Sequence, residues 1–359
     1  MEIEEKIKLI KEVGEEIINE DELRELLQNK EHPIAYDGFE PSGRIHIAQG
    51  LLRSINVNKL TKAGIHFKFW VADWFALMNN KMGGDLEKIR TVGEYFIEVW
   101  KACGMDLTHV EFLWASENMG QDYWLRVIKI GTLNTVTRIT RCSQIMGRNE
   151  KDSLSAAQIF YPCMQCSDIF HLDADITQLG MDQRKVNVLA REVAPKLGHK
   201  KPVVISHHML MGLTPPADLG SDVSGADASI AKKMSKSNPD SAIFMTDTFD
   251  EIKRKFKKAY CPEGEVKDNP VLEYCKYIIF EKIEEFVIER PEKWGGNMQF
   301  NSYADLEAAF VKKELHPMDL KTAAAKYIDS LIDPVRKHFE TDEKAKQLLE
   351  KVESYIVTR

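Results

Sequence analysis

Two lysines in a short, serine-containing segment are the residues of this chain that point most directly to a chemistry. The segment is residues 233–237, which read KMSKS. Lys233 and Lys236 bring two ammonium groups close together, and Ser235 adds a hydroxyl between them. Such groups stabilise the negative charge that builds up on pyrophosphate when a carboxylic acid attacks the α-phosphate of ATP. Taken alone, the segment could equally be a solvated charge cluster, so a second feature is needed.

A second segment, residues 36–46, has features that suit the binding of a nucleotide. It reads YDGFEPSGRIH and runs from an apparent strand through a Pro/Gly turn into a helix. His46, at the start of that helix, can donate to phosphate oxygens, helped by the exposed backbone N–H groups and the helix dipole. Gly38, Ser42 and Gly43 keep the backbone low, so that a nucleotide can approach. Together the two segments predict a site for ATP.

Size and composition indicate a globular protein of two domains. The chain has 359 residues, of which 43% are hydrophobic. Its 49 Lys and Arg and its 56 Asp and Glu give a net charge of −7, so a nucleic-acid partner must be met by local basic patches. No stretch approaches the run of about 18 apolar residues that a membrane span needs. Residues 1–14 are acidic and amphipathic, unlike a targeting signal.

The cysteines favour a reducing compartment. Six of them in a chain of this length do not form a disulfide framework. Cys163 and Cys166 have the C-x-x-C spacing of a zinc ligand pair, but no second pair matches them. We therefore expect a cytoplasmic protein with no structural metal and no membrane partner.

The hydrophobic pattern alternates strands and amphipathic helices from about residue 34 to 206. Strands are expected at 34–37, 67–72, 110–114 and 203–205, and helices at 47–62, 85–102 and 181–194. This alternation predicts an α/β fold built on a Rossmann-type parallel sheet. Beyond about residue 249 the pattern becomes helical, at 250–260, 270–289, 303–313 and 317–339.

These elements divide the chain into four parts. They are an N-terminal helical segment (1–30), a catalytic domain (31–232), the KMSKS loop with its linker (233–248) and an all-helical domain (249–359). Residues at about 115–155 are rich in Thr and Arg and read as a helical insertion in the catalytic domain. The Pro- and Gly-containing stretch before KMSKS reads as a long loop, and loops of that length are usually functional.

The pairing of Pro-Ser-Gly-x-x-His at 41–46 with a distant KMSKS resembles the class I aminoacyl-tRNA synthetases. The resemblance runs from about residue 34 to 339 and is strongest to the tyrosyl-tRNA synthetases of the archaeal and eukaryotic cytosolic type. It implies catalytic roles for His46, Lys233 and Lys236, and Mg²⁺ accompanying the nucleotide. One departure is that the class pattern His-x-Gly-His reads HIAQ here, so the second His is absent and Ala replaces Gly.

The chemistry of a tyrosine substrate can be matched to residue types. A helix that starts or kinks at Pro162 would put Gln165 and Asp168 on one face, with Tyr161 at the mouth of the site. Asp168 can accept a hydrogen bond from the phenol, and Tyr36 can donate one to it. A site built for a hydroxyl rejects phenylalanine because its buried polar groups would stay unpaired, and tyrosine-selective synthetases are the standard example of this rule.

Further binding roles follow from the resemblance. It implies that Tyr161, Gln165 and Gln183 hold the amino group of the substrate, and that Gly180 and Asp182 bind ATP, with Asp182 at the ribose. Each residue alone has a plainer interpretation: a buried tyrosine is commonly a core residue, and an aspartate is commonly a surface carboxylate or a helix cap. Their joint occurrence along a βαβ pattern favours the site.

The helical tail has features that suit RNA. Residues 253–258 form a basic run, which is either a solvated helix face or a phosphate contact. Trp294 stands beside two glycines as a stacking platform for an unstacked base. Asp319 is a helix first-turn acid or, by the resemblance, the reader of the first anticodon base, a guanine that offers two N–H donors. Arg184 is similarly placed for the first base pair of the acceptor stem.

We therefore expect a tyrosine–tRNA ligase that activates L-tyrosine with ATP and transfers it to the 3′-terminal adenosine of tRNA(Tyr). The resemblance also implies a homodimer formed through the insertion, with tRNA spanning two subunits. Three alternatives stay open: a tryptophanyl-tRNA synthetase, a catalytically silent tRNA-binding paralogue, and a nucleotidyltransferase with the same His motif. An intact KMSKS disfavours the silent paralogue, and the helical tail disfavours the nucleotidyltransferase.

Overall fold

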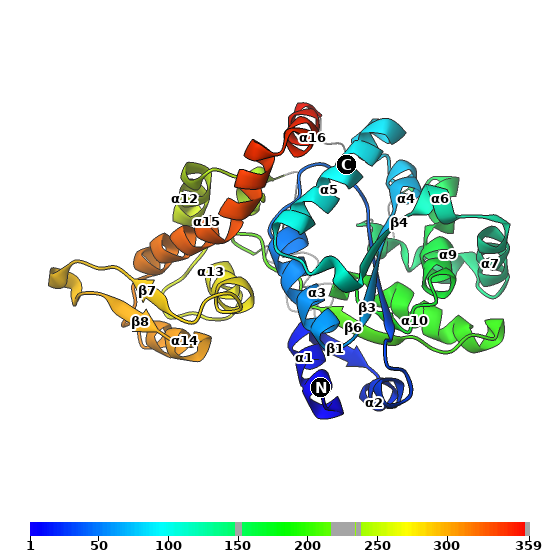
Figure 1. Cartoon of the computed structure of the whole chain (residues 1–359), viewed down its shortest axis with the longest axis horizontal. Coiled ribbons are helices and arrows are strands. Elements are labelled where there is room, and N and C mark those ends of the chain that lie inside the picture. Colours follow the sequence, from blue (N-terminus) through cyan, green and yellow to red (C-terminus); the bar gives the residue numbers. More distant parts are fainter. Residues whose placement is uncertain (148–152, 217–233, 235–237, 356–359) are drawn as a thin grey trace.

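In the part of the chain that the structure describes, six strands form one sheet, with a smaller and mostly helical part beside it (Figure 1). The computed structural model describes residues 1–147, 153–216, 234 and 238–355. The strand order is β1-β6-β5-β2-β3-β4, and neighbours are parallel except for β1, which is antiparallel to β6. The strands are β1 (Gly14–Ile18), β2 (Ile34–Phe39), β3 (His66–Val71), β4 (Val110–Trp114), β5 (Ile176–Thr177) and β6 (Val203–His207).

Helices connect the strands and cover both faces of the sheet (Figure 1). The α-helices are α1 (Ile3–Val13), α2 (Glu20–Asn29), α3 (Arg53–Lys62), α4 (Asp73–Met78), α5 (Leu86–Ala102), α6 (Ala115–Asn118), α7 (Gln121–Thr132), α8 (Val136–Thr140), α9 (Ala156–His171) and α10 (Arg184–Val193). The short 3₁₀ or π elements are η1 (Ala48–Leu52), η2 (Lys81–Gly84), η3 (Leu107–His109), η4 (Ser143–Met146), η5 (Met181–Gln183) and η6 (Ala194–Leu197). The Rossmann-type α/β prediction is confirmed.

Successive residues of the central strands face two separate hydrophobic cores. From β3, Phe67 and Phe69 enter the core that contains α1, α3 and α5. Trp70 of the same strand enters the second core, with side chains from α7, α9 and α10. Because a parallel sheet is covered on both faces, both sets are apolar. The insertion α7 to η4 packs on the second core, where it contacts α9.

Two expectations for this part need correction. Residues 1–30 are not only helical, because Gly14–Ile18 forms β1 and closes the sheet against β6. This makes the sheet mixed rather than wholly parallel. The helix around Pro162 does not start there, so only the second alternative, a kink at Pro162, stays open. It begins at Ala156, where Ser155 and Gln158 form a capping box, and Pro162 lies inside it.

The smaller part is not all-helical. Its elements are η7 (Pro239–Ser241), α12 (Phe249–Lys258), α13 (Pro270–Tyr274), η8 (Cys275–Ile279), β7 (Phe286–Ile288), η9 (Glu292–Trp294), β8 (Met298–Phe300), α14 (Tyr303–Val311), α15 (Pro317–Thr341) and α16 (Glu343–Ser354). The helix expected at 270–289 ends at η8, and β7 pairs antiparallel with β8. Phe286 and Ile288 are buried while Val287 is partly exposed, which is the period of a strand. The last helix, α16, returns to pack on α5 (Figure 1).

The topology sets where a ligand can bind. Strand β2 lies between β3 and β5, and the chain proceeds from it to β3 and β4 on one side and later to β5 and β6 on the other. In open α/β sheets, the crevice at such a reversal, beyond the carboxyl ends of the strands, is the usual ligand site.

Candidate active site

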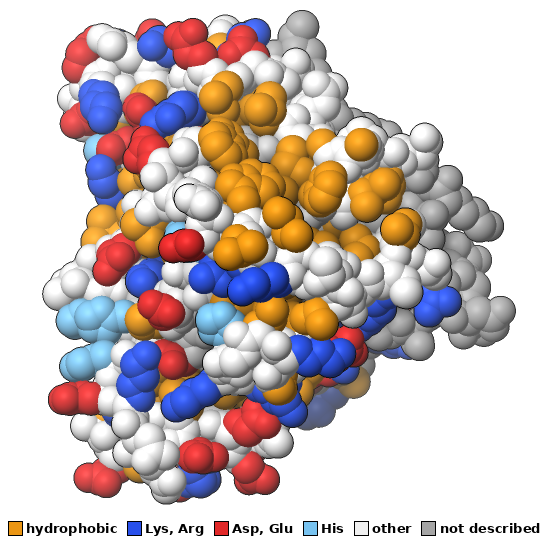
Figure 2. Space-filling view, turned by 90° about the vertical axis from the view of Figure 1, so that its right-hand side faces the viewer, with side chains coloured by type: hydrophobic (Ala, Val, Ile, Leu, Met, Phe, Trp, Pro, Cys, Tyr) orange, Lys and Arg blue, Asp and Glu red, His pale blue; other side chains and the backbone are white. Residues whose placement is uncertain are grey.

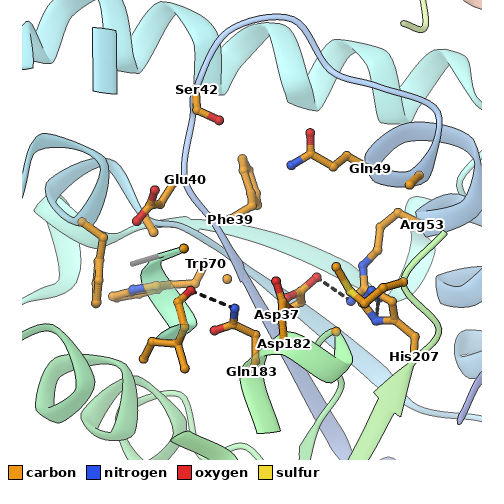
Figure 3. A pocket seen from close by; sticks show the side chains of 18 of the residues that line it. Asp37, Phe39, Glu40, Ser42, Gln49, Arg53, Trp70, Asp182, Gln183 and His207 are labelled. Carbon is orange, nitrogen blue, oxygen red and sulfur yellow. Dashed lines mark hydrogen bonds and ion pairs between the residues drawn. The ribbon is translucent and has the colours of Figure 1, made fainter. Parts of the chain in front are cut away.

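A cavity of about 1020 Å³ opens at this reversal, beyond the carboxyl ends of β2, β3 and β6 (Figure 3). Strand β2 and the turn after it supply the lining from Tyr36 to Glu40, together with Ser42 and His46. Helix α9 contributes one wall, and the segment around η5 contributes another. The cavity is large enough for two substrates.

At the base of the cavity, one buried carboxylate meets two tyrosine hydroxyls. The hydroxyl of Tyr123 lies 2.7 Å from Oδ1 of Asp168, and that of Tyr36 lies 3.4 Å from Oδ2. Burial raises the pKa of Asp168 well above its usual range, although the hydrogen bonds from both tyrosines oppose the shift. Tyr123 comes from α7 in the insertion, and nothing in the sequence signalled it.

A second group of polar side chains lies above this base. Gln165 Nε2 donates to Gln183 Oε1 at 3.0 Å, and Gln183 Nε2 donates to the carbonyl of Ile145 at 3.0 Å. Within the described residues, the buried Oε1 of Gln165 has no hydrogen-bond partner. It is therefore a ready acceptor for a ligand donor.

Glu40 is a further residue that the sequence did not signal. Tyr161 donates to Glu40 Oε1 at 2.6 Å, and Asn79 Nδ2 lies 2.5 Å from the same oxygen. The Nζ atom of Lys81 is 3.8 Å from the other carboxylate oxygen. These contacts fix the ring of Tyr161 against the wall of the cavity, where Phe75 meets it edge to face. Tyr161 lines the cavity, together with Gln165 and Asp168 of the same helix.

Two carboxylates, Asp37 and Asp182, lie close to each other at the centre of the cavity (Figure 3). Burial raises the pKa of Asp37 to about 6, against the opposing effect of Arg53 and with a smaller contribution from Asp182. Only glycine fits at position 180 without displacing its neighbours, because a Cβ atom would lie 2.5 Å from Met209 Sδ and 2.7 Å from Asp182 Oδ1.

A buried network supports Asp37 from below. Arg53 Nη2 lies 2.8 Å from Asp37 Oδ2 and 2.9 Å from the carbonyl of Gln178. Gln178 Nε2 is in turn 3.1 Å from His207 Nδ1. Burial and the neighbouring Arg53 hold the pKa of His207 well below its usual range, so this imidazole is neutral. Arg53, Gln178 and His207 belong to no motif that could have identified them.

The signature segment at 41–46 forms the upper rim. Its turn needs glycine at Gly43, where φ is 97°. At Gly38 a Cβ would lie 3.1 Å from the Tyr36 hydroxyl. Ser42, His46 and Gly38 line the cavity, whereas Gly43 does not. The expected helix after His46 is present and starts with the π-helical turn η1.

Lys233, Ser235 and Lys236 lie outside the described residues. Met234, between them in sequence, is described, is buried and lines the cavity. None of the three predicted RNA residues lines this cavity. Arg184 is paired through Nε with Glu16 at 2.8 Å, and Trp294 has 66% of its surface exposed.

Asp319 lines a second, smaller cavity of about 200 Å³ between β7 and α15. The other lining residues are Val287, Glu289, Thr322, Ala323, Lys326, Tyr327 and Ser330. In the described ranges, no cluster of three His, Cys, Asp or Glu side chains could hold a metal ion, and no helix could span a membrane. All six cysteines are buried free thiols.

Comparison with known proteins bears on this geometry. The family of class I tRNA synthetases for W and Y matches residues 28–333. The chain is 55% identical over 362 residues to the cytoplasmic tyrosine–tRNA ligase 1 of Arabidopsis thaliana, covering 100% of this chain and 90% of the relative. The chain belongs to the tyrosyl-tRNA synthetase family. Its function is therefore that of a tyrosine–tRNA ligase, as the sequence predicted.

Solved structures of this family agree with the fold. The tyrosyl-tRNA synthetase of Pyrococcus horikoshii complexed with L-tyrosine matches with a TM-score of 0.90 and 39% identity, covering 98% of this chain and 100% of that one. The Leishmania major enzyme in complex with tyrosinol matches with a TM-score of 0.89 and 48% identity over 99% of this chain. The chain spans only 61% of the length of the Leishmania protein.

Proposed function

We propose that the large cavity binds L-tyrosine and ATP together, and that its residues form tyrosyl-adenylate and then transfer tyrosine to the terminal adenosine of tRNA(Tyr). The single observation that supports this best is the buried Asp168 at the base of the cavity. Its Oδ1 atom accepts a hydrogen bond from the hydroxyl of Tyr123 at 2.7 Å. A buried acceptor flanked by two hydroxyls suits a phenol, which is both a donor and an acceptor.

Selection of tyrosine rests on this polar base. The substrate phenol donates to Asp168 and accepts from Tyr36, whose hydroxyl lies 3.4 Å from Asp168 and which lines the cavity. Phenylalanine has no hydroxyl, so it would exclude water from these two polar groups without offering them a hydrogen bond, which is a strong penalty. At the other end of the substrate, the ammonium donates to Gln165 Oε1, next to Tyr161 and Gln183.

ATP is assigned to the part of the cavity between Asp182 and the signature segment. Asp182, beside Gly180, takes the ribose, and Asp37 lies near enough to add a second carboxylate acceptor. His46, Ser42 and the backbone at Gly38 face the phosphates, while Gly43 shapes the turn between them. Mg²⁺ enters with ATP as part of the substrate. Lys233, Ser235 and Lys236 are assigned to the departing pyrophosphate on the sequence argument.

The reaction needs no nucleophile from the protein. The carboxylate of tyrosine attacks the α-phosphorus of ATP, the bond to the bridging oxygen breaks, and pyrophosphate leaves with its charge stabilised by donors. In the second step, a ribose hydroxyl of the terminal adenosine attacks the acyl carbon and AMP leaves. The role of the protein is to orient the reactants and to place positive charge.

The tRNA contacts are assigned to Arg184, Trp294 and Asp319. Asp319 lines a cavity of about 200 Å³, and a carboxylate there can accept the two N–H groups on the Watson–Crick edge of guanine. The exposed Trp294 offers a face for stacking. Arg184 would leave its ion pair with Glu16 and contact the acceptor stem of the tRNA instead.

A homodimer is proposed from the surface of the insertion. Figure 2 shows a broad patch of hydrophobic side chains on the side of the molecule that carries α7. The exposed large hydrophobic residues there are Trp124, Leu125, Ile128, Leu133, Val136 and Phe160. An exposed hydrophobic patch of this kind marks an interface. In a homodimer with twofold symmetry, the same patch of both subunits forms that interface. We also propose a cytoplasmic location.

Amino-acid-dependent exchange of labelled pyrophosphate into ATP, without tRNA, tests the proposal. Exchange with tyrosine alone is the expected result. Exchange with tryptophan would indicate a tryptophanyl-tRNA synthetase instead. No exchange with any amino acid, from protein with a cooperative thermal transition, would favour a silent RNA-binding paralogue.

A further inference from the structure

Arg44 lies inside the signature segment, two residues before His46, yet its side chain does not line the large cavity. It reaches instead across to the segment that follows KMSKS. Its Nη2 atom lies 2.9 Å from Thr246 Oγ1 and 3.2 Å from Asp247 Oδ1. The guanidinium also lies 4.7 Å from the ring centroid of Phe244.

Asp247 is the centre of these contacts. It is fully buried, and its second oxygen, Oδ2, lies 2.5 Å from Lys255 Nζ and 2.9 Å from the backbone N–H of Phe244. The carbonyl of Asp247 accepts from Arg336 of α15 at 2.9 Å. A buried carboxylate with two cations and a backbone donor is held in one geometry.

Lys255 extends this arrangement into the smaller part of the molecule. It belongs to α12, is only 4% exposed, and donates to the carbonyl of Ala242 at 2.8 Å. The cations around Asp247 therefore come from different places: Arg44 from the signature segment and Lys255 from the helical part. Removing one of them leaves a buried charge partly uncompensated.

The two segments are also joined through their backbones, with His46 at the centre. Phe244 forms an antiparallel bridge with His46. On either side, Ile47 N–H donates to the carbonyl of Ile243 at 2.8 Å, and Met245 N–H donates to the carbonyl of Ile45 at 3.0 Å. The backbone that carries His46 into the cavity is thus paired with the segment that Asp247 fixes.

We propose that the Arg44–Asp247 ion pair is a positioning device for adenylate formation, which holds His46 in register with the segment that follows KMSKS. This inference rests on the proposed function, in which His46 faces the phosphates of ATP. Neither Arg44 nor Asp247 touches substrate. They act through the backbone pairing of residues 45–47 with 243–245, which lies on the ATP side of the cavity and away from Asp168.

The proposal predicts different effects on the two substrates. Loosening the pair should weaken the use of ATP, because a shift of a fraction of an ångström in His46 spoils its alignment with the phosphates. The tyrosine end of the cavity, built on α7 and α9, should be unaffected. A general loss of structure would impair both.

The test is pyrophosphate exchange by Arg44→Lys and Asp247→Asn, with KM measured separately for ATP and for tyrosine. Arg44→Lys keeps the charge but loses the forked donor geometry. We expect kcat/KM for ATP to fall about 10-fold in Arg44→Lys and about 100-fold in Asp247→Asn, with KM for tyrosine within about twofold of the unmodified chain.

Arg90→Lys is the matched control. Arg90 likewise pairs with a carboxylate, Glu117, and its guanidinium lies 4.9 Å from the ring centroid of Trp114, but these partners belong to α6 and β4 and not to the segments paired around His46. It should leave both KM values unchanged. Tyrosine binding measured by calorimetry without ATP shows whether each variant keeps its fold.

The outcomes separate this inference from the proposed function. If the unmodified chain exchanges pyrophosphate with tyrosine, the proposed function stands whatever the variants do. The positioning role is then overturned if Arg44→Lys retains normal kinetics for ATP, or if the KM values for ATP and tyrosine rise in parallel. No exchange by the unmodified chain would overturn the proposed function first, and this inference with it.

Discussion

Tyr123 of the insertion donates a hydrogen bond to Asp168 across the second core, with 2.7 Å between the two oxygens. The same hydroxyl lies 2.9 Å from the carbonyl of Met164 in α9. The insertion therefore supports the base of the cavity as well as covering the sheet. It connects the surface on which we place the dimer interface to the residue on which we place tyrosine selection.

The first prediction concerns this contact. Tyr123→Phe removes a hydrogen bond to a buried carboxylate, which typically stabilises by about 1.5–3 kcal/mol. We expect kcat/KM for tyrosine in pyrophosphate exchange to fall about 10- to 100-fold, with KM for ATP unchanged. Tyr303→Phe, which removes a partly buried hydroxyl from α14 in the smaller part of the molecule, should not change kcat/KM. Normal selectivity in Tyr123→Phe would show that Asp168 does not need this donor.

The second prediction concerns Asp319. Asp319→Asn replaces an acceptor by a group that also donates, so the two N–H groups of guanine lose a matched partner. We expect kcat/KM for tRNA(Tyr) to fall about 10- to 100-fold, in line with one bidentate base contact, and exchange without tRNA to stay normal. Glu340→Gln, on the exposed side of the same helix, is the control. A transcript with adenine in place of the first anticodon guanine should lose activity with the unmodified chain but little more with Asp319→Asn.

The third prediction concerns the hydrophobic patch. Ile128 is 61% exposed in the single chain, so Ile128→Glu should fold normally but place a charge inside the proposed interface. Sedimentation equilibrium at micromolar concentration should then report a monomer in place of a dimer. Val311→Glu makes the same kind of change at a residue of α14 that is 52% exposed, and it should sediment as the unmodified chain does. An unmodified chain that is monomeric would refute the interface itself.

The fourth prediction concerns pH. His208 lies between Glu15 and Glu273, 3.1 Å from each, and stacks on Tyr277. Burial opposes its charge, but the hydrogen bonds to the two carboxylates raise its pKa from 6.5 to about 9. Because the folded pKa is the higher one, the contribution to stability is complete below about pH 6.5 and is lost as pH rises through about 9.

A shift of this size corresponds to about 3 kcal/mol at most. Denaturant unfolding of His208→Gln should therefore show a loss of about 1–3 kcal/mol at pH 6 and a much smaller loss at pH 10. His199→Gln is the control, since burial lowers the pKa of His199 and it forms no ion pair with a carboxylate among the described residues. An equal loss at both pH values would mean that packing on Tyr277, not the charge, is what His208 contributes.

Much of the fold could be read from the sequence because its signals are local. The alternation of buried strands and amphipathic helices located β3, β4 and α5 to within a residue or so. The errors arose where context overrides local pattern. Gly14–Ile18 is short and becomes a strand only by pairing with β6, and Phe286–Ile288 leaves a helical pattern because β8 is beside it.

The sequence by itself determined the family, and it pointed to the two signature segments that we assign to ATP and to the helix that we assign to tyrosine. Each of these is a short run whose residue types and spacing have a direct chemical meaning. The tertiary structure decided the partners of those residues. Tyr123 meets Asp168 across 45 residues, Arg53 meets Gln178 across 125, and Arg44 meets Asp247 across 203. Contacts over such separations leave no local periodicity, since they depend on how the sheet brings distant segments together.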